Sequence, residues 1–273
     1  MNPYFGDLGD VWKHLPLAEI LRLNPPRHYW ETHAGSASYP LTPTPARQHG
    51  VLRFLDYAPG EPELQDSSYL RALQEYPELY PGSALLAMRA LGQEASYIFC
   101  DIDPESAASL RSEVAGLDAR VIEADGVSAI ADEAQRAPVE PHDVLVLIDP
   151  FLPFERFTPD SQTPIELAAS LASAGYRLFF WYSYDTVEQR GWARDQLASL
   201  APGVDLWCGD TLMPASFIFP DRSGPWGCGI LLANATPAEQ SACRQLGHAL
   251  EHLSATDLLS GNNPPRLTFQ LMR

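Results

Sequence analysis

The stretch Val144-Leu145-Val146-Leu147-Ile148-Asp149-Pro150-Phe151 decides the fold of this chain of 273 residues. Five apolar residues run without interruption into an Asp-Pro pair. A short apolar run of this kind is typical of a parallel strand that is buried on both faces. We therefore expect a strand over 144–148 and a doubly wound sheet around it, with Asp149 where the chain leaves the sheet. In open α/β sheets, ligands bind at this carboxyl edge.

The Asp-Pro corner itself is a candidate active site. Proline fixes the turn, so the carboxylate of Asp149 and the carbonyl of Pro150 can both point into a cleft as hydrogen-bond acceptors. Phe151 follows directly, where an aromatic ring can cover a flat substrate. The alternative interpretation of the same residues is a strand that ends in an ordinary turn.

Strand-like and helix-like segments alternate through the middle of the chain, which predicts an α/β fold with a doubly wound, mostly parallel sheet. Three successive strands are followed by an acid, namely Asp101, Asp125 and Asp149. Acids at the carboxyl edge of one sheet indicate a site for hydroxyl and amino groups, because one Asp can accept from both hydroxyls of a ribose. The expected strands are 96–99, 120–122, 144–148 and 177–182, and the expected helices are 105–114, 127–135 and 165–174.

The two ends of the chain add further expected elements. A helix runs from Val11 to Leu21 and stops before Pro25-Pro26, and Ser83 is a candidate N-cap for a helix over 84–91. Two strands with no helix between them predict an antiparallel hairpin at the sheet edge. Further expected elements are a strand over 28–32 followed by a small-residue loop over 33–39, the hairpin strands 206–208 and 229–234, a helix over 237–253 and a strand over 266–272.

Residues 40–80 differ in character from the rest, with recurring prolines and few regular runs. This segment has too little apolar mass for a core of its own. We therefore expect one domain over 1–273, with 40–80 as an insertion over the cleft.

Composition excludes several classes of protein. No apolar stretch is long enough to span a bilayer, and the first residues lack a basic region followed by an apolar core, so we expect no signal peptide. The four cysteines form no CxxC pair, which favours reduced, buried thiols in a cytoplasmic protein and no zinc site. His248 and His252 lie one turn apart, but no third ligand is evident, so we expect no metal.

The charge is the most informative property of the composition. Lys and Arg number 18 against 35 Asp and Glu, for a formal net charge of −17. Lys13 is the single lysine, and no Lys/Arg cluster is present. Proteins that grip a phosphate backbone usually carry a basic face. We therefore expect neither DNA nor a membrane as a partner. RNA would be expected only if the net charge of the whole chain conceals a local basic patch.

Six short motifs occur in a fixed order, most of them close to the expected carboxyl edge. Together they resemble the RlmJ-type 23S rRNA adenine-N6 methyltransferases, which use S-adenosylmethionine (SAM). The resemblance covers most of the chain and is strongest between residues 9 and 151. The motifs are Asp10-Val11-Trp12-Lys13-His14, Glu31-Thr32-His33-Ala34-Gly35, Tyr80-Pro81-Gly82-Ser83, Asp101-Ile102-Asp103-Pro104, Ala124-Asp125-Gly126 and Ile148-Asp149-Pro150.

The resemblance implies a class I methyltransferase fold, with seven strands of which one is antiparallel, and a small helical insertion. It also implies a role for each matching residue. Asp149 would accept a hydrogen from the target amine, and Pro150 and Phe151 would complete the catalytic corner. The implied cofactor contacts are His14, His33, Gly35 and Ser83, Lys13 near the methionine carboxylate, Asp101 on the ribose, and Asp125 and Gly126 at the adenine.

Two departures from the family pattern bear on the substrate. The family corner is D-P-P-Y, whereas this chain has Asp149-Pro150-Phe151-Leu152, and residues 2–8 contain no basic residue. With the net charge of −17, these departures favour a small amine-bearing or nucleobase-like substrate over RNA. Its pocket would be lined by Tyr4, Phe5, Phe151, Phe154, Tyr182 and Tyr184, although plain core packing also explains such aromatics.

Two other functions stay open at this point, an rRNA adenine-N6 methyltransferase and a non-catalytic SAM-binding protein. The altered corner also leaves oxygen or carbon open as the atom methylated. We expect a cytoplasmic monomer or homodimer.

Overall fold

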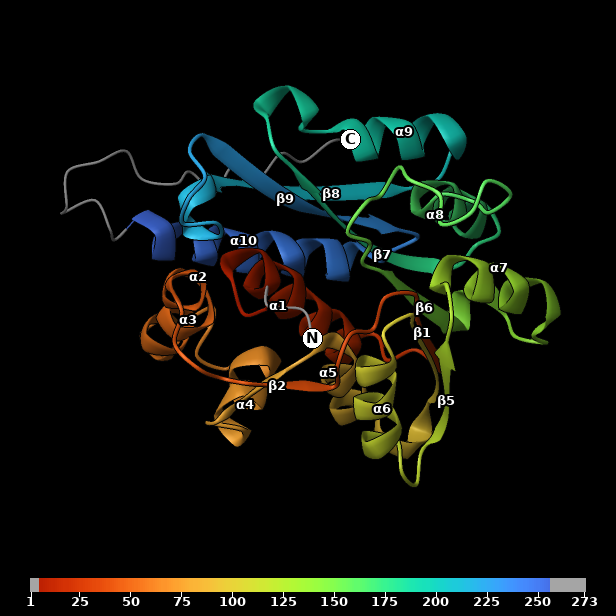
Figure 1. Ribbon diagram of the computed structural model, residues 1–273, viewed down its shortest axis with the longest axis horizontal. Helices are drawn as coiled ribbons and strands as arrows, with labels where there is room; N and C mark the ends of the chain where they lie inside the picture. Colours follow the sequence, from red (N-terminus) through yellow and green to blue (C-terminus); the bar gives the residue numbers. More distant parts are fainter. Residues whose placement is uncertain (1–4, 256–273) are drawn as a thin grey trace.

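The computed structural model describes residues 5–255, and within them seven strands form one sheet between two layers of helices (Figure 1). The strand order is β5-β4-β1-β6-β7-β9-β8. This is the expected class I methyltransferase sheet, mostly parallel with one antiparallel strand. The strands are β1 (His28–Glu31), β4 (Ser96–Asp101), β5 (Asp118–Glu123), β6 (Val144–Ile148), β7 (Arg177–Tyr184), β8 (Leu206–Pro214) and β9 (Pro225–Ala233), beside a separate pair, β2 (Ser38–Pro40) and β3 (Leu79–Pro81).

The helices lie on both faces of the sheet. In Figure 1, α7, α8 and α9 lie on one side of the strands and α1 and α10 on the other. The helices are α1 (Leu8–Leu23), α2 (Pro45–His49), α3 (Val51–Tyr57), α4 (Ser68–Glu75), α5 (Ser83–Leu91), α6 (Pro104–Glu113), α7 (Gly126–Arg136), α8 (Pro164–Ser173), α9 (Trp192–Leu200) and α10 (Pro237–Ala255), with short 3₁₀ turns at 58–60, 92–94, 141–143, 187–189 and 215–217.

Strand β6 lies at the centre of the sheet, as the apolar run predicted. It pairs in parallel with β1 on one side and β7 on the other, and all five of its residues are buried. Strand β9 is antiparallel to both β7 and β8, which confirms the expected hairpin at the edge. Because β8 is antiparallel to β9, it runs in the same direction as β7, and helix α9 makes the crossover between them.

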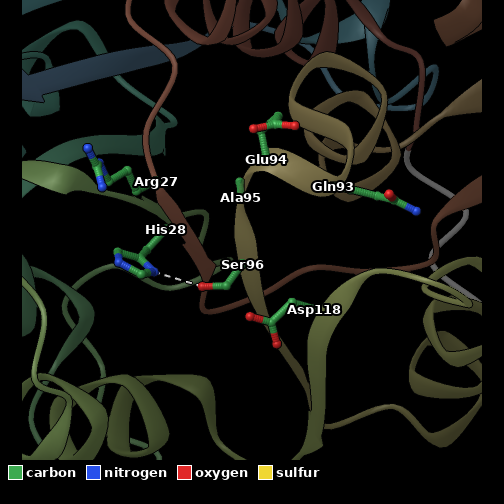
Figure 2. Close-up of a pocket in the computed structure, with 7 residues that line it drawn as sticks. All are labelled: Arg27, His28, Gln93, Glu94, Ala95, Ser96 and Asp118. Carbon is green, nitrogen blue, oxygen red and sulfur yellow. Dashed lines mark hydrogen bonds between the residues drawn. The ribbon is translucent and has the colours of Figure 1, made fainter.

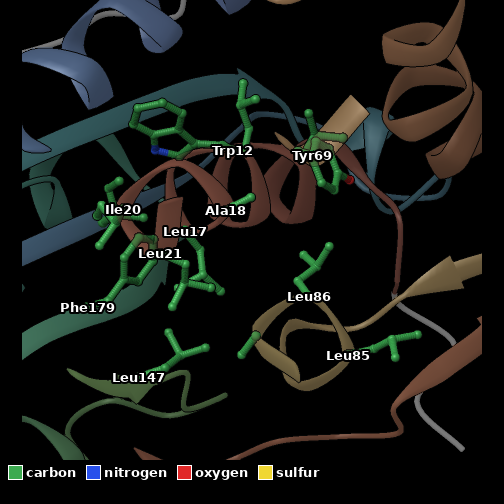
Figure 3. Packing of buried hydrophobic residues seen from close by; sticks show 14 of the residues in the cluster. Trp12, Leu17, Ala18, Ile20, Leu21, Tyr69, Leu85, Leu86, Leu147 and Phe179 are labelled. Atoms are coloured by element: carbon green, nitrogen blue, oxygen red, sulfur yellow. The ribbon is translucent and has the colours of Figure 1, made fainter. Parts of the chain in front are cut away.

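Helix α1 fills the core on one face of the sheet (Figure 3). It packs against α4, α5 and α10, and its buried side chains include Trp12, Ile20 and Leu21. A helix that is buried nearly all round has no solvent face for polar residues. Lys13 and His14 are nevertheless buried in it, and buried charged residues need partners. Two adjacent buried polar residues on this helix therefore point to a built site.

A second apolar cluster occupies the opposite face, under α7, α8 and α9. It includes Ile130, Ile165 and Leu197 from these helices and Trp30 and Phe180 from the sheet. The two clusters cover the sheet from both sides, which is why β6 is apolar without alternation.

The segment 40–80 forms α2, α3 and α4 between the paired strands β2 and β3. These helices pack against α1. Arg47 of this segment is buried, donates to the carbonyl of Phe5, and places its guanidinium 3.6 Å from the Phe5 ring centroid. The segment thus fixes the chain that enters α1.

Several smaller expectations can be compared with the structure. Ser83 is the first residue of α5 and not its cap, because Gly82 takes the N-cap position without a side-chain bond. All four cysteines are buried and free. The strand expected over 266–272 lies outside the described residues. None of the helices in 5–255 is both long enough and apolar enough to cross a membrane.

Gly126 provides a test of packing between α7 and the loop after β1. A Cβ at this position would lie 1.8 Å from the carbonyl oxygen of Thr32, which is backbone and cannot move aside cheaply. We expect Gly126→Ala to lower the free energy of unfolding by about 2–3 kcal/mol. Gly60→Ala is the control, since a Cβ there meets nothing within 4 Å. Urea denaturation of both variants measures the difference, and equal stability would contradict this account of Gly126.

Candidate active site

A pocket of about 590 Å³ lies at the carboxyl edge of the sheet, where the loops after β1, β4, β6 and β7 meet the start of α1. Its volume falls in the range of small-molecule and cofactor sites. The loop between β8 and β9 also lines it, through Ile218, Phe219 and Arg222. The residues predicted from the sequence that line it are Phe5, Lys13, His14, His33, Gly35, Ser83, Asp101, Asp149, Pro150 and Phe151.

Lys13 joins two parts of this pocket through ion pairs. Its ammonium lies 2.6 Å from Oδ2 of Asp149 and 2.9 Å from Oδ1 of Asp10. Burial alone would lower the pKa of Lys13, but the charges and hydrogen bonds of Asp10 and Asp149 raise it well above its ordinary value. Lys13 therefore stays charged and holds the Asp149 carboxylate at the mouth of the pocket, where that side chain is 16% exposed.

Asp7 and Asp10 support this arrangement from the first turn of α1. Asp7 caps the helix by accepting from the Asp10 backbone nitrogen at 2.9 Å, and Oδ2 of Asp10 accepts from the nitrogen of Gly6 at 2.8 Å. Burial opposes the charge of Asp10, but Lys13 outweighs it and the pKa of Asp10 is lowered. Burial and the neighbouring Asp10 charge raise the pKa of Asp7 to about 7. Asp10 thus forms the ion pair with Lys13, and Asp7 titrates near neutral pH.

His14 is held as a neutral imidazole. Burial, with a contribution from the Lys13 charge, lowers its pKa to about 3. Tyr69 donates to the Tyr80 hydroxyl at 3.3 Å, and Tyr80 lies 2.7 Å from Nδ1 of His14. If each hydroxyl donates onward, Nδ1 accepts and Nε2 carries the hydrogen. Nε2 is buried and has no hydrogen-bond partner among residues 5–255. A ligand in the pocket can supply that partner, for which an anionic oxygen is best suited.

Glu31 lies beneath the pocket and fixes Ser83. It is fully buried and accepts hydrogen bonds from the Ser83 hydroxyl and, at 3.2 Å, from the Tyr29 hydroxyl. Burial, reinforced by the charge of Asp149, raises the pKa of Glu31 to about 8. A carboxyl group with this pKa is mostly protonated at neutral pH, so Glu31 adds little negative charge near Asp149.

The opposite end of the pocket is built from the loops after β1 and β4. Gly35 has φ +61°, a left-handed conformation that favours glycine, and its nitrogen donates to Oδ2 of Asp101 at 2.8 Å. Oδ1 of Asp101 accepts from the nitrogen of Asp103 at 2.8 Å. Burial lowers the pKa of His33, whose Nδ1 lies 2.7 Å from the Thr32 hydroxyl. Asp101 is thus oriented at the strand end, where a ribose can be bound through its two hydroxyls.

Five of the predicted site residues that the structure describes, Asp125, Gly126, Phe154, Tyr182 and Tyr184, do not line this pocket. Asp125 caps α7 through the nitrogens of residues 127 and 128, and Gly126 packs on Thr32. Phe154 is 44% exposed outside the pocket, and Tyr182 points into the other core cluster, where its hydroxyl donates to Asp210. Tyr4 lies outside the described residues. Tyr184 is also buried in that second cluster.

Other lining residues were missed by the sequence interpretation. Trp181 and Ser183 line the pocket in place of Tyr182, because side chains alternate along strand β7 and neighbours face opposite sides. Arg222 lies in the β8–β9 loop, lines the pocket, and pairs with Asp185 at 3.0 Å. Alternation places Trp181 and Ser183 on one face of β7, but the apolar sequence of this strand does not show which face borders the pocket, and the loop residues had no signal either.

A second hollow of about 590 Å³ lies at the amino edge of the sheet (Figure 2). It is lined by Arg27, His28, Ser96 and Asp118, among others. Nδ1 of His28 lies 2.7 Å from the Ser96 hydroxyl oxygen. None of the predicted site residues borders it. Within the described part of the chain, no group of three His, Cys, Asp or Glu side chains could hold a metal ion.

Comparison with known proteins gives a consistent result. Residues 24–189 match the family model described as "Ribosomal RNA large subunit methyltransferase D, RlmJ". The chain is 28% identical over 198 residues to the ribosomal RNA large subunit methyltransferase J of Escherichia coli K12, a match that covers 65% of this chain and 66% of that protein.

One solved structure shares the fold, and a second gives a weaker match. A crystal structure of a Legionella pneumophila protein has a TM-score of 0.71 at 19% identity, over 98% of this chain and 97% of that one. A SAM-dependent methyltransferase from Agrobacterium tumefaciens has a TM-score of 0.45 at 10% identity, over 80% of this chain and 60% of that one.

The family match corrects the expectation about partners. A small molecule was expected in preference to RNA, on the basis of the net charge and the altered corner. That expectation is wrong, because both the matching family and the E. coli relative are ribosomal RNA methyltransferases by description. Net charge averages over the whole surface and does not identify the substrate of one pocket.

Glu31 gives the site a measurable pH dependence. Its pKa is about 8 in the fold against an ordinary 4.5, so the folded state binds an extra proton between these values. The stability that this proton confers is complete below about pH 4.5 and is lost as pH rises toward about 8, by at most about 1.4 kcal/mol per pH unit. We expect Glu31→Gln to flatten this decline in urea unfolding measured from pH 5 to 9. Glu113→Gln, at an exposed position on α6, should keep the wild-type slope, and an unchanged slope in Glu31→Gln would refute the assignment.

Proposed function

The chain belongs to the family of ribosomal RNA large subunit methyltransferase J, and from this we propose that it transfers a methyl group from SAM to N6 of an adenine in 23S ribosomal RNA. The family match and the E. coli relative support the RNA substrate. The adenine and its N6 atom follow from the family pattern quoted above. This substrate would place the protein in the cytoplasm.

One observation supports this function more than any other: Lys13 holds the carboxylate of Asp149 at the mouth of the pocket. Oδ2 of Asp149 is taken by Lys13, and its other oxygen accepts no hydrogen bond within residues 5–255. The Pro150 carbonyl and the Phe151 ring border the same space. Two acceptors beside an aromatic ring form a geometry suited to a planar amine.

SAM is the cofactor, and when bound it supplies an activated methyl group, so the protein has to position and stabilise the reactants. Asp149 and Pro150 would accept the two hydrogens of the adenine amine and turn its lone pair toward the methyl, at a reacting distance of about 3–3.5 Å. The charge of Asp149 would also stabilise the positive charge that develops on nitrogen. Lys13 acts as a positioning residue, since it fixes the carboxylate and leaves one oxygen open.

Phe151 can take the role that the tyrosine has in the family corner. Its side chain is 79% exposed at the pocket mouth, so no protein contact competes with a base for its ring. An enzyme that modifies a base must take it out of the stack, and an aromatic ring compensates for part of the lost stacking. The loss of the second proline therefore moves the ring forward by one residue without removing it from the site.

The residues of the pocket fit SAM. Asp101 is oriented for the ribose hydroxyls, and the unpartnered Nε2 of His14 and the ammonium of Lys13 can approach a carboxylate. Ser83, fixed by Glu31, borders the same end of the pocket. The neutral state of His14 favours this arrangement, because a second buried cation beside Lys13 would be unfavourable.

The test is methyl transfer to deproteinised ribosomal RNA from cells that lack this gene, with methyl-labelled SAM. Asp149→Asn can still accept from Lys13 but loses the negative charge. We expect it to lower kcat by about 100- to 1000-fold, as for loss of one charge-stabilising group, with the Kd for SAM nearly unchanged. Asp160→Asn, an exposed acid in the same loop, is the control.

The labelled RNA is then digested to nucleosides and separated by chromatography. Label in N6-methyladenosine that is lost in Asp149→Asn supports the proposal. Label in a different nucleoside would refute the assignment of N6, and no label in RNA from the wild-type protein would overturn the proposed function.

A further inference from the structure

Three exposed aromatic side chains lie in the segments that follow β6 and β7 at the carboxyl edge, and neither the cofactor site nor the catalytic corner uses them. They are Phe154 and Phe157, in the loop between β6 and α8, and Trp192, the first residue of α9. Their exposed fractions are 44%, 62% and 51%. We call these three residues the aromatic platform. We propose that the platform binds unpaired bases that flank the target adenine, by stacking, an inference that rests on the proposed function.

The topology brings the three rings to one edge of the molecule. Strands β6 and β7 are adjacent and parallel, so the chain leaves both at the carboxyl edge. Helices α8 and α9 follow these strands, run back against them and pack on each other (Figure 1). Their first turns therefore lie at the same edge as the pocket. Phe154 and Phe157 precede α8, and Trp192 begins α9.

The platform is continuous with the pocket. Phe151 and Leu152 line the pocket and are themselves exposed, and Phe154 and Phe157 follow in the same loop. Of the large apolar side chains exposed in residues 5–255, the loop over 151–157 and the segment 187–192 hold the majority. Patches of this kind mark interaction sites. We infer that a chain with one nucleotide in the pocket places its next nucleotides over these rings.

The loop that carries the phenylalanines is fixed before any ligand binds. Arg156 donates to Oε1 of Glu166 at 2.6 Å, and Glu166 also closes a capping box with Thr163 at the start of α8. Pro153 is buried, and its carbonyl accepts from the nitrogen of Ile165 at 3.2 Å. The backbone that carries Phe154 and Phe157 is therefore attached to the start of α8 by hydrogen bonds. A preorganised loop loses little entropy on binding.

Charge selects bases over phosphates as the ligand of this surface. The arginines at this edge lie in ion pairs, Arg156 with Glu166, Arg190 with Asp210, Arg194 with Asp195 and Arg222 with Asp185. A phosphate would have to displace a carboxylate from each of them, in a chain of net charge −17. Stacking needs no counterion, and single-stranded RNA is commonly bound through unstacked bases on aromatic rings. An acidic protein can bind RNA in this way with few phosphate contacts.

The experiment measures binding of a fluorescent 12-nucleotide single-stranded RNA, and of its duplex, to the full chain from 50 to 300 mM NaCl. We expect the single strand to bind more tightly than the duplex. Each phosphate contact on a single strand contributes about −0.7 to the slope of log affinity against log salt, so a stacking surface should give a slope no steeper than about −2.

Variants separate stacking from other contacts. Phe154→Ala, Phe157→Ala and Trp192→Ala should each weaken binding about tenfold. Phe157→Tyr, which keeps an aromatic ring, should retain the affinity, whereas Phe157→Leu, which keeps only apolar bulk, should lose it. Leu23→Ala is the control, since Leu23 is an exposed apolar residue at the far end of α1. Unchanged SAM binding shows that each variant is folded.

Three results would overturn the inference. The first is wild-type RNA affinity in the alanine variants, and the second is a salt slope steeper than about −3. The third is that the alanine variants bind RNA normally but no longer self-associate in sedimentation as the wild-type protein does, which would assign the surface to a contact between copies. Methyl transfer to ribosomal RNA is measured separately on the same wild-type sample. If it occurs while the platform variants bind normally, only this inference fails. If it does not occur at all, the proposed function fails whatever the binding shows.

Discussion

The ion pairs of Lys13 with Asp10 and Asp149 are the interaction on which the site depends. They connect the first turn of α1 to the end of β6, two segments 136 residues apart in sequence. The lysine lies in the apolar layer formed by α1, where an unpaired charge would be strongly unfavourable. Both carboxylates are therefore required for Lys13 to stay charged, and Lys13 is required for Asp149 to stay fixed. The corner after β6 keeps its place because the core of the molecule holds its partner.

Much of the fold follows from the sequence, because the strands of a parallel sheet are apolar on both faces and their ends are marked by polar residues. The same logic predicted Asp101 and Asp149, which line the pocket, and Asp125, which does not line it. An acid directly before the first residue of a helix can also be its N-cap, and Asp125, which precedes Gly126, has that role in α7. Tyr182 lies in the second core cluster and not at the pocket, since the facing side of a strand is set by tertiary packing, which places Trp181 and Ser183 at the pocket. Helix α9 was not predicted, because its short segment follows a loop with no clear boundary signal.

An acidic protein can act on RNA, because the net charge describes the whole surface and the reaction takes place in one small part of it. The total charge reflects the whole surface, whereas the reaction concerns one nucleotide at one edge of the sheet. The acids at the pocket are partly neutralised, because Lys13 forms ion pairs with Asp10 and Asp149. Glu31, beneath the pocket, is mostly protonated at neutral pH because its pKa is about 8. The acceptor corner can then approach a base without a large local repulsion.

The burial of Lys13 has a further consequence for the chemistry of the whole chain. It is the single lysine of the sequence and is only 7% exposed. The folded protein therefore presents no accessible side-chain amine to acetylating enzymes, to ubiquitin ligases or to amine-reactive dyes. Reagents of this class would reach Lys13 only after α1 has separated from the sheet. The residue that organises the active site is thus also a natural chemical reporter of global unfolding.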